Sequence, residues 1–118
     1  MEYRSDIENF HKLMEQGGFR TTANLFTNSL MQINGAQTNI TDLLRQMELN
    51  GIQRIRYNDL MISGIMLNNG MRLISASGKC KFSNMVTEGV DCNFNEIFVI
   101  NIEPLSVRIV FYKFDYWA

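Results

Sequence analysis

The sequence predicts a mainly β domain with one or two short helices. From Ile52 onwards, β-branched and aromatic residues recur with the alternation typical of strands. Asn-Gly pairs, which favour tight turns, occur at residues 34–35, 50–51 and 69–70. The sequence closes with an apolar run from Val107 to Trp117, so we expect this end to be buried in the core or by another subunit. With 118 residues, the chain is expected to form a single domain over residues 1–118.

The first predicted element is a helix over residues 5–16. Ser5 and Glu8 have the spacing of a capping box. The apolar residues that follow recur at helical spacing, and they are Ile7, Phe10, Leu13 and Met14. The pair Gly17-Gly18 predicts the end of the helix. His11 is expected on the polar side of this helix, and we assign it no catalytic role.

The next segment, residues 19–33, reads as extended, and Asn34-Gly35 predicts a hairpin turn after it. Residues 41–50 allow two interpretations. Thr41 could cap a helix that Asn50-Gly51 ends, or the segment could be a short strand followed by a turn. The local signals favour the helix.

The remainder is predicted as strands and turns. The strands are expected over residues 59–67, 71–77, 79–85, 97–102 and 105–117, after a first alternating stretch at 52–55. Asn68-Asn69-Gly70 predicts a turn, residues 86–95 a connection, and Pro104 a second turn. The last strand is apolar on both faces, with Val107, Ile109 and Phe111 on one and Val110, Tyr112 and Phe114 on the other. Such a strand is expected between two layers.

Composition narrows the possible functions. The net charge of −1 argues against a dedicated nucleic-acid binder, which would be basic. No apolar run approaches the roughly 20 residues of a membrane span, and the first residues lack the features of a signal peptide. We therefore expect no membrane binding by this chain, and a protein made in a cytoplasm.

Residues with catalytic or metal-binding potential are few. No catalytic triad, zinc-protease or phosphate-loop motif is present, so we predict no enzyme activity, no cofactor and no metal site. Cys80 and Cys92 lack metal-ligand spacing. We expect both to be free thiols, with a disulfide as the alternative.

The two ends of the sequence resemble the tail tube proteins of contractile-tailed bacteriophages. Those proteins carry a helix, a glycine break and a motif of the kind G-x-F-x-R-x-N-x-F, which here matches residues Gly17 to Phe26. Near the other end they have a Gly-apolar-(P)-x-N connection and a closing Tyr-Trp, matched here by Gly89 to Asn93 and by Asp115 to Trp117. The proline of the connection is absent, and one extra residue separates Arg20 from Asn24.

This resemblance implies an antiparallel β-sandwich or half-barrel that forms hexameric rings. The rings would stack into the tail tube of a virion, with DNA only in transit through the lumen and with sheath and baseplate proteins as neighbours. The same resemblance also allows a second interpretation, in which the protein is a baseplate component that initiates the tube. The implied interface residues are Phe19, Arg20, Asn24, Phe26, Phe114, Tyr116 and Trp117. The alternative function is a small cytoplasmic, phage-encoded binding or inhibitor module that acts on a host protein.

Overall fold

The computed structural model describes residues 3–26, 29–67, 70–84, 88–103 and 106–118. Asn68 and Asn69 of the predicted turn, and Pro104, lie outside these ranges. The helices are α1 (Tyr3–Glu15), α2 (Phe19–Thr22), the 3-10 turn η1 (Ala23–Phe26) and α3 (Ile40–Leu49). The strands are β1 (Leu30–Ile33), β2 (Ala36–Thr38), β3 (Arg54–Met66), β4 (Met71–Ser83), β5 (Glu88–Glu103) and β6 (Ser106–Trp117).

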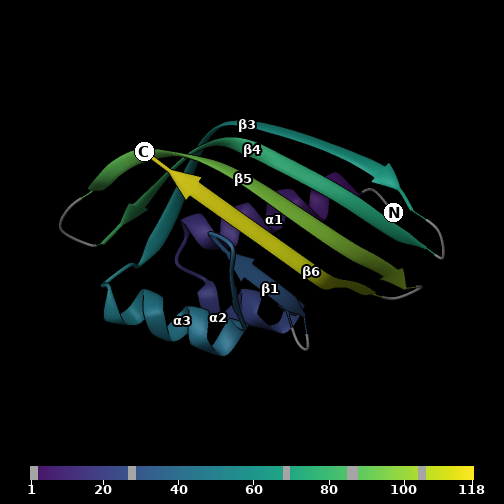
Figure 1. Ribbon diagram of the computed structural model, residues 1–118, viewed down its shortest axis with the longest axis horizontal. Helices are drawn as coiled ribbons and strands as arrows, with labels where there is room; N and C mark the ends of the chain where they lie inside the picture. Colours follow the sequence, from purple (N-terminus) through teal and green to yellow (C-terminus); the bar gives the residue numbers. More distant parts are fainter. Residues whose placement is uncertain (1–2, 27–28, 68–69, 85–87, 104–105) are drawn as a thin grey trace.

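The described strands form one six-stranded sheet in the order β2-β1-β6-β5-β4-β3 (Figure 1). All neighbouring strands are antiparallel except β1 and β6, which are parallel. The mainly β prediction is therefore confirmed, whereas the antiparallel β-sandwich or half-barrel is not found. The physical reason is that helices, and not a second sheet, cover the apolar face.

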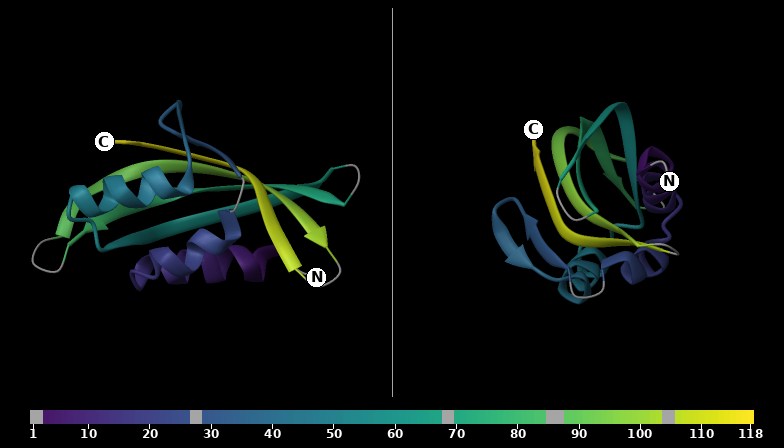
Figure 2. Two further views of the ribbon diagram at one scale, coloured as in Figure 1. Left: turned by 90° about the horizontal axis from the view of Figure 1, so that it is seen from below. Right: turned by 90° about the vertical axis from the view of Figure 1, so that its right-hand side faces the viewer.

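The core lies between the helices and one face of the sheet (Figure 2). Helix α1 contributes Ile7, Phe10 and Met14, while η1 contributes Phe26 and α3 contributes Met47. The sheet contributes the inward side chains of β3 to β6, and the fully buried ones include Ile74, Cys80, Phe94, Phe98 and Ile100. The alternation of these positions along each strand explains why one face is apolar.

The predicted helix boundaries are confirmed to within a few residues. Gly17 adopts a φ of 76°, and the Gly18 N–H donates to the Leu13 carbonyl at 2.7 Å, as in a Schellman motif. Helix α3 ends in the same way, with Gly51 at a φ of 68°. Its N-cap is Asn39 and not Thr41, because the Asn39 side chain accepts a hydrogen bond from the Asp42 N–H at 2.9 Å.

The extended segment predicted over residues 19–33 is wrong for residues 19–26. Phe19 to Phe26 form α2 and η1, and only residues 30–33 form a strand. Thr22 is buried, and its hydroxyl donates to the Phe19 carbonyl at 2.6 Å. Burial of Thr22 and Phe26 outweighs a local preference for strand, which is weak in any short segment.

The two-sided burial predicted for the last strand is corrected by a bulge. Val99 pairs with Phe111 while its neighbour Ile100 pairs with Ile109, so Val110 is an extra residue in β6. A bulge shifts the alternation by one residue. Ile109 and Tyr112 consequently lie on the same, buried face, and Phe111 is half-buried on the other.

The two strands predicted over 71–77 and 79–85 are one strand, β4, which runs from Met71 to Ser83. The residue between them, Gly78, faces a second bulge, which lies in β3. Asp59 adopts a φ of 55° within β3. Opposite it in β4, Gly78 leaves room for this bulge, since a Cβ there would meet the Asn58 carbonyl oxygen at 2.7 Å. The glycine therefore bends the sheet without interrupting β4. The connection predicted over 86–95 belongs largely to β5, which begins at Glu88.

Candidate binding pocket

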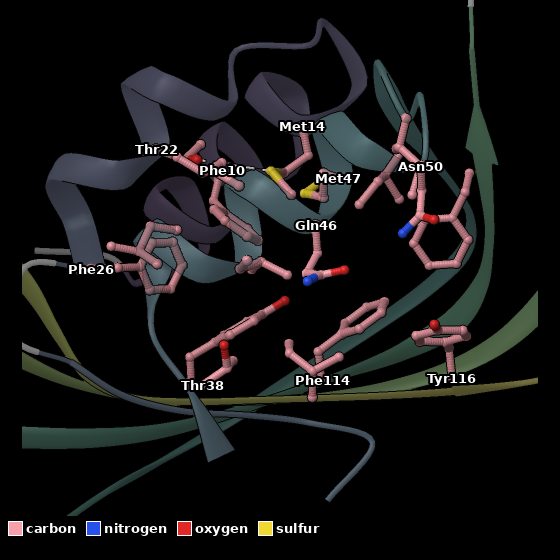
Figure 3. Close-up of a pocket in the computed structure, with 18 of the residues that line it drawn as sticks. Phe10, Met14, Thr22, Phe26, Thr38, Gln46, Met47, Asn50, Phe114 and Tyr116 are labelled. Carbon is pink, nitrogen blue, oxygen red and sulfur yellow. Dashed lines mark hydrogen bonds between the residues drawn. The ribbon is translucent and has the colours of Figure 1, made fainter. Parts of the chain in front are cut away.

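A cavity of about 300 Å³ opens between the helices and the face of the sheet that they cover, beside β6 (Figure 3). Helices α1, α2 and α3, the turn η1 and the β1–β2 hairpin form its walls. Its lining includes Phe10, Met14, Phe26, Ile33, Ala36, Ile40, Leu43, Met47, Ile55, Phe82 and Phe114. This volume is at the lower end of the range for pockets that hold small organic ligands.

The lining is apolar and aromatic. Among the described residues that form it, none carries a charged side chain. The polar groups are the hydroxyls and amides of Thr22, Thr38, Gln46, Asn50, Tyr112 and Tyr116. Because an ion would lose its hydration here without a counter-charge, the pocket suits a neutral molecule.

The amides lie at the solvent side of the pocket. Gln46 and Asn50 both project from the α3 region, and both are exposed. Figure 3 shows the Gln46 side chain reaching into the space between Met47 and Phe114. A bound molecule would therefore meet apolar walls at depth and hydrogen-bonding amides near the opening.

A buried polar cluster adjoins the inner wall. The side chain of Glu96, on β5, is fully buried. One of its carboxylate oxygens lies 2.7 Å from His11 Nε2, and the other accepts a hydrogen bond from the Tyr112 hydroxyl. Tyr112 lines the pocket, whereas Glu96 and His11 do not. The Tyr112 side chain thus links the lining of the cavity to the buried carboxylate.

Burial and charge both act on this cluster. Burial raises the pKa of Tyr112 well above its usual value, and the nearby Glu96 carboxylate raises it further. The pKa of Tyr57 is raised for the same two reasons. Both phenols therefore remain protonated at neutral pH, as donors and not as bases.

The position of His11 corrects its predicted place on the polar side of the helix. The residue is buried, and its ring lies 4.4 Å from that of Tyr57. It continues the apolar stripe, since Ile7, His11 and Met14 are spaced by four and three residues. His11 Nδ1 and the Tyr57 hydroxyl have no hydrogen-bond partner among the described residues.

The structure brings together part of the predicted interface set. Phe26, Phe114 and Tyr116 line the pocket, and the first two are buried. Phe19 and Arg20 lie on α2, where the exposed Arg20 forms an ion pair with Glu48 at 3.1 Å. Asn24 belongs to η1.

Trp117 lies near the end of β6 and is 47% exposed, so it does not belong to the core. Of the two expected forms of burial, the core of its own domain does not supply it, and burial by another subunit is untested. Its predicted role at an interface stays a prediction.

Sequence reasoning missed the Glu96 cluster and most of the pocket. Glu96 stands between apolar residues at an inward position of a strand, and this pattern is the signal that was present. Within the described ranges, no group of three histidine, cysteine or acidic residues is placed to hold a metal ion. Over the same residues, no helix is long and apolar enough to cross a membrane.

Comparison with known proteins places the fold. The sequence matches no protein-family model and no curated protein. The structure is similar to nuclear transport factor 2 (NTF2) from Cryptosporidium parvum, with a TM-score of 0.76, 10% identity, and coverage of 97% of this chain and 90% of that chain.

Two further solved structures are similar over nearly the whole chain. The beta subunit of benzoate 1,2-dioxygenase from Burkholderia mallei has a TM-score of 0.75 and 8% identity, with 98% of this chain and 88% of that chain covered. A candidate scytalone dehydratase from Novosphingobium aromaticivorans has a TM-score of 0.75 and 5% identity, with 98% and 82% covered. Enzymes and non-enzymes therefore share this fold. The fold alone does not show whether this protein is an enzyme.

These similarities overturn the resemblance to tail tube proteins. The tube function, the virion location and the reading as a baseplate initiator are wrong, because the likeness to NTF2-like structures covers almost the entire chain. The quoted motifs comprised short runs at the two ends, and in the structure residues 19–26 are helical and do not open a strand. The chain has the NTF2-like fold.

Proposed function

We propose that this protein is a binding module that takes a small, neutral and mainly apolar molecule into the pocket beside β6. The observation that carries the proposal is the cavity of about 300 Å³ with apolar walls and amides at its opening. Burial of apolar ligand surface would supply most of the affinity. Gln46 and Asn50 would orient a polar end of the ligand.

The chemistry of the walls supports binding in preference to catalysis. A general base must lie within hydrogen-bond reach of the reacting proton. The buried Glu96 accepts a hydrogen bond from Tyr112 of the pocket wall, but both of its oxygens have partners and it does not line the cavity. The hydroxyls and amides that do line the cavity are not bases at neutral pH.

The binding proposal is tested with the neutral fluorescent probe N-phenyl-1-naphthylamine. Its emission rises when it enters an apolar site, and we expect saturable one-to-one binding to the full chain. Ala36, an exposed residue of β2 that lines the pocket, is replaced by tryptophan to obstruct the opening. We expect Ala36→Trp to weaken binding at least about tenfold, which is a loss of about 1.4 kcal/mol.

The matched control is Gln37→Trp. Gln37 is the next residue of the same strand, is also exposed, and does not line the pocket. Successive strand residues point to opposite faces, so this tryptophan should leave binding unchanged. Equal affinity of Ala36→Trp and wild type, or equal loss in both variants, would contradict the proposal.

Self-association remains a proposal, and the outer face of the sheet supports it. The register aligns five apolar residues in one row across five strands, namely Ile65, Leu73, Val99, Phe111 and Leu30. Ile65 and Leu30 are about 60% exposed. Four strands of about 13 residues offer a face of roughly 800 Å², which is what one partner buries in a standard interface. A second copy of this chain is the occupant that we propose.

Sedimentation velocity tests this interface. We expect a dimer for the wild-type chain and a monomer for Ile65→Lys, because a charge would be buried in the row. Leu49→Lys is the control, since Leu49 is also an exposed apolar residue, at the end of α3, but lies off the sheet. A monomeric wild type, or dissociation by both substitutions, would contradict it.

A further inference from the structure

Cys80 and Cys92 are neighbours across two strands. They pair directly in the antiparallel register of β4 and β5. Side chains that pair directly lie on the same face of a sheet, and both thiols pack toward the core. The Cα atoms of such pairs are about 4.5–5.5 Å apart, within the range of about 4.4–6.8 Å that a disulfide spans. Both cysteines are free thiols in the structure.

The two thiols differ in access. Cys80 is fully buried, between Tyr57 on β3 and Cys92 on β5. Burial, and then the neighbouring Cys92, raise the pKa of Cys80 to about 12. Cys92 is partly exposed, and its Sγ lies 3.7 Å from the carbonyl oxygen of the exposed Val90. A soluble oxidant would therefore reach Cys92 first.

We propose that Cys80 and Cys92 form a reversible disulfide when the protein reacts with hydrogen peroxide. The Cys92 thiolate attacks the peroxide, the O–O bond breaks, and Cys92 becomes a sulfenic acid as the other oxygen leaves as water. The Cys80 sulfur then attacks the Cys92 sulfur, the S–O bond breaks, and a second water carries away the Cys80 proton. The thiols lose two electrons and hydrogen peroxide gains them.

The fold favours this second step over intermolecular reaction. Adjacent strands hold the two sulfur atoms together, so the effective concentration of Cys80 at Cys92 is far above that of a second chain. The new bond would tie β4 to β5 directly and close the intervening segment. Because the bond restricts the unfolded chain, the oxidised protein should melt at a higher temperature.

The test treats the full chain with hydrogen peroxide and measures intact mass, free thiols and linked peptides. We expect the mass to fall by two hydrogen atoms, both thiols to disappear, and a peptide pair joined through Cys80 and Cys92. Dithiothreitol should restore the thiols. The melting temperature of the oxidised form should rise by about 5 °C or more.

Two variants make the test decisive. Cys92→Ser retains only the buried thiol, which should stay reduced under the same treatment. Cys80→Ala, which changes the core little, should trap Cys92 as a sulfenic acid that dimedone labels. A wild-type chain that gains oxygen at Cys92 while Cys80 stays free, or that links only to other chains through Cys92, would overturn the proposal.

Discussion

Tyr112 donates a hydrogen bond to the fully buried Glu96, and it does so from the wall of the pocket. The other oxygen of the carboxylate contacts His11 at 2.7 Å. The cluster joins α1 to the two central strands β5 and β6. It therefore fixes the pocket wall to the rest of the core, and we treat it as structural.

Replacing Glu96 with alanine should destabilise the fold strongly. The Tyr112 hydroxyl and the His11 ring would lose their partner in a buried site, and we expect a loss of about 3 kcal/mol or more. Urea denaturation measures this change. The control is Glu48→Ala, which removes an exposed ion pair with Arg20 and should change stability by less than about 1 kcal/mol. Similar effects of the two substitutions would show that the cluster is not structural.

Alkaline pH should destabilise the reduced protein in part through Cys80. The pKa of this thiol is about 12 in the folded chain and 9.0 at its ordinary value, so between these pH values the native state binds the proton that the unfolded state has lost. The stabilisation is complete below pH 9.0 and declines as pH rises, by up to about 1.4 kcal/mol per pH unit.

Urea denaturation between pH 7 and pH 10.5, with a reductant present, measures this decline. Cys80→Ala removes the titrating group and should show a shallower decline than wild type above pH 9.0. Tyr57 and Tyr112 add to the loss in both proteins at higher pH, since their pKa values are also raised. Parallel curves for the two proteins would refute the role of Cys80.

Near the end of β6, Tyr116 and Trp117 are 38% and 47% exposed, and the two residues are expected to differ through the contacts that Tyr116 makes. The Tyr116 ring lies 4.9 Å from that of Phe82, and the Tyr116 N–H donates to Asn34 Oδ1 at 2.8 Å. We expect Tyr116→Ala to lose about 2 kcal/mol and to weaken probe binding, because this ring lines the pocket. Trp117→Ala should lose less than about 1 kcal/mol. Thermal melting compares them, and the reverse order would contradict the packing described.

Local signals in the sequence predicted several elements correctly. Gly17-Gly18 marked the end of α1, whereas the predicted cap Ser5 lies inside this helix, which already includes Tyr3. Asn34-Gly35 gave the β1–β2 turn, in which the two residues have φ values of 50° and 80°. Helix α3 was predicted from residues at 41–50. Each of these signals acts through contacts between residues a few positions apart. Such contacts do not depend on the rest of the fold, so they can be predicted from the sequence.

Long-range packing decided the features that the sequence did not reveal. The bulge at Val110 reverses which residues of β6 face the core, and it depends on pairing with β5. Helices, and not a second sheet, cover the core, because α1 and α3 pack on the same face of the sheet. The local sequence of either helix does not show this packing. The pocket combines residues from Phe10 to Tyr116, so no single motif contains it.

The central claim is that a small neutral molecule binds inside the pocket, and methionine methyl NMR tests it most directly. Met14 and Met47 line the pocket, whereas Met61 and Met66 are exposed on β3 away from it. On saturation with N-phenyl-1-naphthylamine, we expect ring-current shifts at the Met14 and Met47 methyl groups and unchanged signals from Met61 and Met66. Shifts at Met61 or Met66, with Met14 and Met47 unaffected, would contradict the account.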